Sequence, residues 1–428
     1  MENKHSTGVL ALFGNKPFMI LWIGQILSQI SSNMILYLLA VVVYKSTGSN
    51  TAVSGLYMAF GIPSVIFGVL AGAIVDHLDR RRVIIVSGIL RALLVGLLPF
   101  VTANTGVVYL VLFLSAVISQ FYLPAEAPLI PQYVRERELV TANSLFSFAF
   151  YSSMALGFVF AGPTLRVLGD TGSFIFIAGL FVLSSWISVV LPKNGKNSQD
   201  LSRYLQYDIV EGIRKISGSI ADGISYVSQS KTLGDCLLLL TGTQIIFAIL
   251  GTLAPGFADR VMGIDIRDAS VIIIGPVVGG VLMGSLWVGN VGFRYNRSKL
   301  INTGIISAGV TLVVVSIIIY LKRFTGFHFL FEDQVIVPLV ISLFFLLGIA
   351  NSLLDVPANS MLQDHAEGDM RGRVYGVLSA AVGGIGILPV LLGGILADAI
   401  GVGKVISLLG AVIALYGIYR VRYRKFTY

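Results

Sequence analysis

Residues 72–84 read GAIVDHLDRRRVI and place six polar side chains between two apolar stretches. Apolar residues run up to Asp76, and a second apolar run begins directly after Arg82. Three consecutive arginines cannot lie in the hydrocarbon core of a bilayer without a large energetic cost. This stretch therefore indicates a short loop at a membrane surface, between two helices that cross the membrane.

The composition of the whole chain supports a membrane protein. Hydrophobic residues make up 55% of the 428 residues and charged residues 12%, and the mean hydropathy is +0.86. Soluble domains average about 25% charged residues, because their surface faces water. The chain also contains repeated apolar runs of the length that crosses a bilayer as a helix, roughly 20 residues. We therefore predict an all-α membrane protein.

The apolar runs predict twelve transmembrane helices. They lie at 18–43, 51–75, 83–103, 107–130, 140–165, 171–191, 233–256, 269–291, 300–321, 334–355, 376–397 and 404–420. One long connection divides them into two sets of six. The predicted domains are thus an N-terminal six-helix bundle (1–191), a cytoplasmic linker (192–232) and a C-terminal six-helix bundle (233–428).

Two features of this division bear on function. Apolar residues recur at steps of three or four and predict an amphipathic helix in the linker, lying on the inner membrane surface. They are Ile209, Ile213, Ile216, Ile220, Ile224 and Val227. Pro124-Ala125 and Pro357-Ala358 take the same place at the cytoplasmic end of the fourth span of each half. Duplicated six-span halves are typical of transporters, with the substrate site between them near the middle of the membrane.

The positions of lysine and arginine orient the chain. With the spans above, 22 of the 30 Lys and Arg residues lie on the side of the termini and seven on the opposite side. Short cytoplasmic loops carry an excess of these residues. We therefore expect both termini in the cytoplasm, in a multi-pass protein of the plasma (inner) membrane. The formal net charge of +8 is then a topology signal, and no nucleic-acid partner is expected.

Nothing in the sequence is typical of an enzyme. No nucleotide-binding loop or nucleophile–base pairing stands out, and the four histidines lie far apart. The single cysteine, Cys236, excludes an internal disulfide, and no Cys/His cluster has the spacing of a metal site. We expect no catalytic residue, no metal and no cofactor.

The loop at 72–84 resembles the signature loop of the major facilitator superfamily, G-x-x-x-D-x-x-G-R-K/R-x. Its members here are Gly72, Asp76, Asp79, Arg80 and Arg81, with Asp79 where the signature has glycine. In the family, this cluster latches the two halves in the outward-facing state, and the resemblance implies that role here. The residue types fit it, because a glycine lets another helix approach and a carboxylate can meet the positive end of a helix. The alternative is a loop whose charge only sets topology.

Further stretches resemble the drug:proton antiporter branch of that superfamily, which includes macrolide and siderophore exporters. They are residues 15–34, 123–145 and 355–376, together with Arg91-Ala92. Two features depart from the branch. Gly157 and Gly162-Pro163 are similar to its fifth-span signature with the spacing off by one, and the fourth span lacks an arginine that many proton-coupled exporters carry. The resemblance implies the major facilitator fold, with two pseudo-symmetric six-helix bundles.

Polar residues of the first span are candidates for a substrate cavity. Gln25, Gln29 and Asn33 are four residues apart and share one helical face, which would be costly if it faced lipid. That face lines a cavity or packs against another helix. We favour the cavity, because the first span of each half lines it in the superfamily. The other cavity candidates are Tyr37, Tyr151 and Gln244.

Three ionisable residues are candidates for proton coupling. Glu126 and Asp355 lie near the inner ends of the fourth and tenth spans, where a partly desolvated carboxyl group can exchange protons in the working pH range. Alternatively, they are partners for nearby loop arginines. Arg91 lies within the third span and is expected to snorkel to the surface or pair with a carboxylate.

These observations favour a secondary active transporter that works by alternating access and is coupled to protons. It would export amphipathic small molecules of drug, macrolide or siderophore type. The expected partners are the substrate, protons and membrane lipids, and the chain is expected to act as a monomer. Two alternatives remain: a lysophospholipid flippase of the same fold, and a membrane scaffold or sensor that transports nothing.

Overall fold

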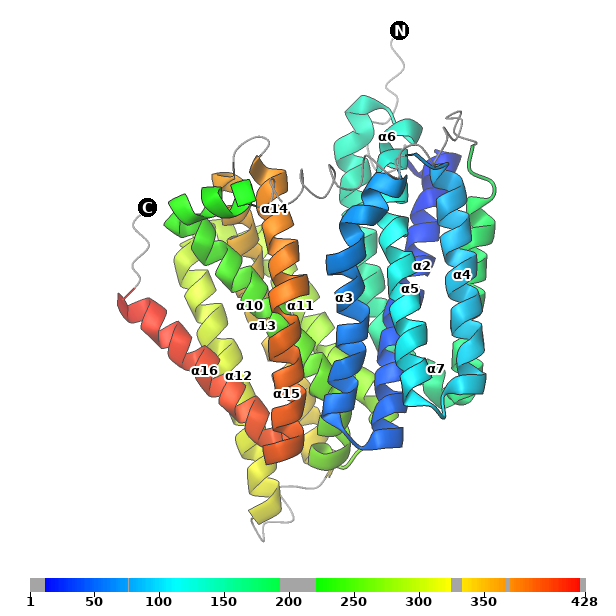
Figure 1. The fold of residues 1–428 in the computed structure, drawn as a ribbon. Coiled ribbons are helices and arrows are strands. Elements are labelled where there is room, and N and C mark those ends of the chain that lie inside the picture. The colour runs from blue at the N-terminus through cyan, green and yellow to red at the C-terminus, as the bar shows by residue number, and fades with distance from the viewer. Residues whose placement is uncertain (1–11, 76, 193–220, 325–332, 367–369, 424–428) are drawn as a thin grey trace. The chain divides into compact units, whose positions relative to one another are not determined.

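The computed structural model describes residues 12–75, 77–192, 221–324, 333–366 and 370–423, and these residues form helices and no strand (Figure 1). The α-helices are α2 (Lys16–Thr47), α3 (Asn50–Val75), α4 (Arg80–Val101), α5 (Thr105–Glu126), α6 (Ile130–Tyr133), α7 (Leu139–Ser188), α10 (Lys231–Gly256), α11 (Gly275–Val291), α12 (Arg297–Phe324), α13 (Asp333–His365), α14 (Met370–Ala380), α15 (Ile387–Ile400) and α16 (Val402–Tyr423). The predicted all-α fold is confirmed.

Eleven helices in the described residues are long and apolar enough to cross a membrane, so the predicted number of twelve is not confirmed. The difference lies in α7, which covers both the fifth and the sixth predicted spans. A continuous helix of that length would extend about 75 Å, more than twice the hydrocarbon core of about 30 Å. Its backbone leaves the helical conformation at Gly169 (φ 67°, ψ −176°), between the two predicted spans.

The chain forms two compact units. Unit 1 holds residues 1–42 and 59–217, and unit 2 holds residues 43–58 and 218–428. The end of α2 and the beginning of α3 therefore belong to unit 2, a division that the sequence does not indicate. Most of the predicted linker and its amphipathic helix lies outside the described residues. The described part of the linker is helical over 221–229.

Small residues hold the helices of unit 1 together, as is common in membrane proteins. Helix α4 packs against both α5 and α7. Gly88 of α4 lies so close to α7 that a Cβ atom at this position would be 2.0 Å from the Ser185 Oγ. The Ser184 hydroxyl donates a hydrogen bond to the Gly24 carbonyl at 2.8 Å, which ties α7 to α2. These contacts position the third-span arginine among its neighbours.

Unit 2 uses glycines in the same way. A Cβ atom at Gly348 of α13 would lie 2.1 Å from the Val277 carbonyl oxygen of α11. A Cβ atom at Gly309 of α12 would lie 2.4 Å from the Ala414 nitrogen of α16. At both places the backbones approach so closely that only a hydrogen fits between them.

Candidate functional site

The side chain of Arg91 lies inside unit 1 and is 2% exposed, so it does not snorkel to the surface. Its Nη2 donates a hydrogen bond to the Ser28 Oγ at 2.8 Å, and its Nη1 donates one to the Ser32 Oγ at 3.3 Å, both on α2. Its Cζ lies 4.5 Å from the centroid of the Phe181 ring and 5.1 Å from that of Tyr122. Hydroxyl groups and aromatic faces together compensate a cation that has left water.

Glu126 completes this buried cluster. It is the last residue of α5, is 2% exposed, and interacts electrostatically with Arg91. It also interacts with the hydroxyl group of Tyr122, one helical turn earlier on α5. We name this set, Arg91, Tyr122 and Glu126, the buried charge cluster.

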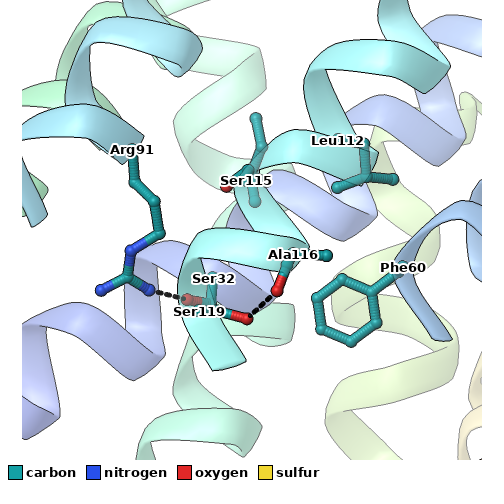
Figure 2. A pocket seen from close by; sticks show the side chains of 8 residues that line it. Ser32, Phe60, Arg91, Leu112, Ser115, Ala116 and Ser119 are labelled. Atoms are coloured by element: carbon teal, nitrogen blue, oxygen red, sulfur yellow. Dashed lines mark hydrogen bonds between the residues drawn. The ribbon is translucent and has the colours of Figure 1, made fainter. Parts of the chain in front are cut away.

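A small hollow opens beside Arg91 (Figure 2). It has room for about one water molecule. Its lining combines the guanidinium and three hydroxyl groups with apolar side chains, from Ser32, Ile35, Phe60, Arg91, Leu112, Ser115, Ala116 and Ser119. Drug-sized ligands occupy pockets of about 300–1,000 Å³. The hollow therefore suits a water molecule or a single polar group, and not a whole amphiphile.

The polar face predicted on the first span does not line this hollow. Asn33 donates a hydrogen bond to the Gln29 carbonyl at 2.8 Å, and its Cβ would lie 2.8 Å from a Cβ atom placed at Gly157 of α7. Gln25 is 4% exposed and its Oε1 has no partner among the described residues. Tyr37 is 1% exposed. The face thus turns into unit 1, and Asn33 packs against α7.

The other predicted site residues lie in separate places. Tyr151 of α7 is 61% exposed, and its ring meets Phe150 edge-on with centroids 5.5 Å apart. Gln244 of α10 is exposed and Asp355 of α13 is partly buried, both in unit 2. The buried charge cluster belongs to unit 1.

The signature loop is partly described. Asp79 caps the amino end of α4, because its Oδ1 accepts hydrogen bonds from the Arg81 and Arg82 backbone nitrogens at 3.0 and 3.4 Å. The Arg81 guanidinium donates to the Val189 carbonyl at the end of α7. A Cβ atom at Gly72 would meet nothing within 4 Å, so no described helix packs on it here. Arg80 is the first residue of α4, and Asp76 lies outside the described residues.

Unit 2 contains a buried ion pair whose pairing the sequence does not indicate. The Arg420 Nη1 of α16 lies 3.8 Å from the Asp235 Oδ2 of α10, and Arg420 is 1% exposed. Its Nε donates a hydrogen bond to the Asn302 Oδ1 at 3.3 Å, and its Cζ lies 5.8 Å from the Tyr416 ring centroid. In the sequence, Arg420 belongs to a basic C-terminal run and counts only toward topology. The spacing of Tyr416 and Arg420, one helical turn apart, is the one local signal of this contact.

Residues 21–388 match the family model of the Major Facilitator Superfamily. The chain belongs to this superfamily. The resemblance seen in the loop at 72–84 is thereby confirmed, and so is the expectation of a transporter rather than an enzyme. With its apolar helices, this superfamily member is a multi-pass membrane transporter, which fits a location in the plasma membrane.

Two relatives of this superfamily member carry names that describe efflux. The "Multidrug efflux pump Tap" of Mycolicibacterium fortuitum is 26% identical over 89% of this chain and 88% of its own length. The "Macrolide efflux protein A" of Streptococcus pyogenes is 25% identical over 69% of this chain and 72% of its own length. Both are small-molecule transporters by their names.

The fold is that of solved transporters. The crystal structure of a POT family transporter in complex with 5-aminolevulinic acid superimposes with a TM-score of 0.73, over 97% of this chain and 97% of that one, at 13% sequence identity. At this identity the likeness concerns the fold alone. The predicted major facilitator fold is confirmed.

Proposed function

We propose that the protein exports amphipathic small molecules of drug or macrolide type by alternating access, and that inward movement of protons drives the export. The substrate class rests on the efflux relatives, and proton coupling rests on the buried charge cluster of unit 1. The sequence-based orientation, with both termini in the cytoplasm, and the monomeric state belong to the same proposal. The same proposal includes the conformational latch at residues 72–81 and the substrate cavity. The proposed cavity residues are Gln25, Gln29, Asn33 and Tyr37 of α2, Tyr151 of α7 and Gln244 of α10.

The buried charge cluster is the observation that carries the coupling. Arg91 is a buried cation held by two α2 hydroxyl groups, and the buried carboxyl group of Glu126 interacts with it from α5. A titratable group in such surroundings is rare in a membrane span and marks a functional site. Glu126 is the carboxyl group that interacts with Arg91.

The contacts suggest how a proton changes the structure. When Glu126 holds a proton, Arg91 keeps its hydrogen bonds to Ser28 and Ser32. When Glu126 loses the proton, the carboxylate attracts the guanidinium toward α5 and competes with the α2 hydroxyl groups. The charge of Glu126 thus decides whether Arg91 holds α4 to α2 or to α5. A helix rearrangement of this kind can be linked to the rocking of the two halves.

The test is uptake into energised inside-out vesicles. The probes are a labelled macrolide, a cationic dye, a siderophore and a lysophospholipid, each with and without a protonophore. We expect protonophore-sensitive accumulation of at least one soluble amphiphile. We also expect Glu126→Gln to reduce accumulation against a gradient at least tenfold while substrate still moves down its own gradient, because the amide keeps the shape and cannot titrate.

Glu136→Gln is the matched control, since Glu136 is an exposed carboxylate in the short helical turn Glu136–Glu138 before α7, and it should transport normally. Full protonophore-sensitive accumulation by Glu126→Gln would refute the coupling role. Movement of the lipid alone, insensitive to the protonophore, would identify a flippase. Normal membrane insertion with no movement of any probe would favour the scaffold or sensor.

A further inference from the structure

The turn between α2 and α3 lies in unit 2, although most of both helices lies in unit 1. Helix α2 ends at Thr47, Gly48 follows with a φ of 64°, and α3 begins at Asn50. A turn this short leaves the last carbonyls of one helix and the first amides of the next side by side. The two ends carry partial charges of opposite sign.

Asp398, in the last turn of α15, binds the amino end of α3. Its Oδ1 accepts hydrogen bonds from the Asn50 backbone nitrogen at 2.8 Å and the Asn50 Nδ2 at 2.9 Å. Its Oδ2 accepts from the Ser49 Oγ at 2.5 Å, the Thr51 backbone nitrogen at 2.9 Å and the Thr51 Oγ1 at 2.8 Å. Five donors surround one carboxylate, and its negative charge meets the positive end of the helix dipole. A cap of this kind normally comes from the helix's own chain neighbours.

Arg260, at the far end of the α10 segment, binds the carboxyl end of α2. It lies in the π-helical turn Phe257–Met262, and its Nη2 donates to the Gly48 carbonyl. Its Cζ lies 5.9 Å from the centroid of the Tyr44 ring. A cation at the negative end of α2 therefore stands opposite the anion at the positive end of α3.

The helices beneath the turn are in close backbone contact. A Cβ atom at Gly394 of α15 would lie 2.1 Å from the Ser54 Oγ and 2.7 Å from the Asn50 carbonyl oxygen. A Cβ atom at Gly256 of α10 would lie 2.2 Å from the Asn50 Oδ1. Asn50 and Ser54 are both fully buried, with 0% exposure. Water therefore does not reach these two side chains.

We infer that Asp398 and Arg260 form a clamp on the α2–α3 turn that keeps the transporter closed toward the outside. The inference rests on the proposed alternating access and orientation. Beyond Met58, α3 continues into unit 1, so rocking of the halves must pull its first turns away from α10 and α15. The clamp provides contacts that are made in the closed state and lost in the open one. Asp398 and Arg260 thereby set the balance between the two states and need not touch the substrate.

The experiment measures access to Ser54 and does not require transport. In a Cys236→Ser background, Ser54→Cys is treated in intact cells with a thiol reagent that does not cross membranes. We expect slow labelling with the clamp intact and labelling at least tenfold faster in Asp398→Asn and in Arg260→Gln. Asp170→Asn is the matched control, because Asp170 is an exposed carboxylate on the same predicted side, outside the clamp, and it should leave the rate unchanged.

Two reporters separate failure of the clamp from failure of the proposed orientation. Ala103→Cys and Gln132→Cys lie at exposed positions on opposite predicted sides of the membrane, and only Ala103→Cys should label in intact cells. If this pattern is reversed, the orientation is wrong, and the clamp is tested in the same way with inside-out vesicles. The clamp is overturned if Ser54→Cys labels at the same rate with the clamp intact, in Asp398→Asn and in Arg260→Gln. This outcome counts when both reporters label as expected and the proteins are monodisperse in detergent.

Discussion

Replacing Arg91 by lysine separates two roles of this residue, since the variant keeps the positive charge and loses the forked guanidinium. The two hydrogen bonds from the guanidinium to Ser28 and Ser32, at 2.8 and 3.3 Å, are then lost or reduced. Hydrogen bonds between membrane helices average about 0.6 kcal/mol in double-mutant cycles. Two such bonds correspond to about 1.2 kcal/mol, or a factor of about eight in a rate constant. We expect Arg91→Lys to lower kcat/KM for protonophore-sensitive uptake by about that factor.

A double-mutant cycle tests whether the loss comes from these bonds. Ser28→Ala combined with Ser32→Ala removes the same two acceptors and should lower kcat/KM to a similar extent. Adding Arg91→Lys to this double variant should then cause little further loss, because interacting residues are not additive. Wild-type kcat/KM in Arg91→Lys would refute the reasoning, since it would show that only the charge at this position matters. Strict additivity would refute the assigned contacts.

Two further predictions concern the packing and charge of unit 2. The Cβ of Gly348→Ala would lie 2.1 Å from a carbonyl oxygen of α11, so α11 and α13 must move apart by about 1 Å. We expect the variant to lose about 1–3 kcal/mol of stability. The readout is a lower thermal midpoint in detergent than that of Gly242→Ala, whose Cβ meets nothing within 4 Å; equal midpoints would contradict the close contact. Asp235→Asn removes the counter-ion of a buried Arg420, and breaking a buried pair costs about 3–5 kcal/mol. Adding Arg420→Met should restore most of the midpoint, and a double variant as unstable as the single one would show that the pair is not the cause.

The helices and the family could be predicted from the sequence because their signals are local. Apolar runs of about 20 residues mark the spans, and the loop at 72–84 carries a recognisable spacing. The number of separate helices is not confirmed, because α7 covers the fifth and sixth predicted spans and its backbone leaves the helical conformation at Gly169, between them.

The site required contacts that no local pattern reveals. We expect from the sequence that Arg91 snorkels or pairs with a carboxylate. The Glu126 carboxyl group interacts with it from α5. Arg91 does not snorkel, because Ser28, Ser32 and Phe181 surround it from two other helices. In the sequence those residues are an ordinary serine pair and one of many phenylalanines. Asp398 likewise reads as the polar end of an apolar span. Its five hydrogen bonds exist only because the beginning of α3 lies against α15.

The division of the chain between the two units also predicts where it bends. Helix α2 passes from unit 1 to unit 2 between Val42 and Val43, within an apolar run without glycine or proline. Helix α3 passes back between residues 58 and 59, just before Gly61 and Pro63, and helices kink most readily at such residues. We therefore expect α2 to move as one rigid helix and α3 to bend. A force applied to the turn between them would then be carried across the membrane by α2 and absorbed near Pro63.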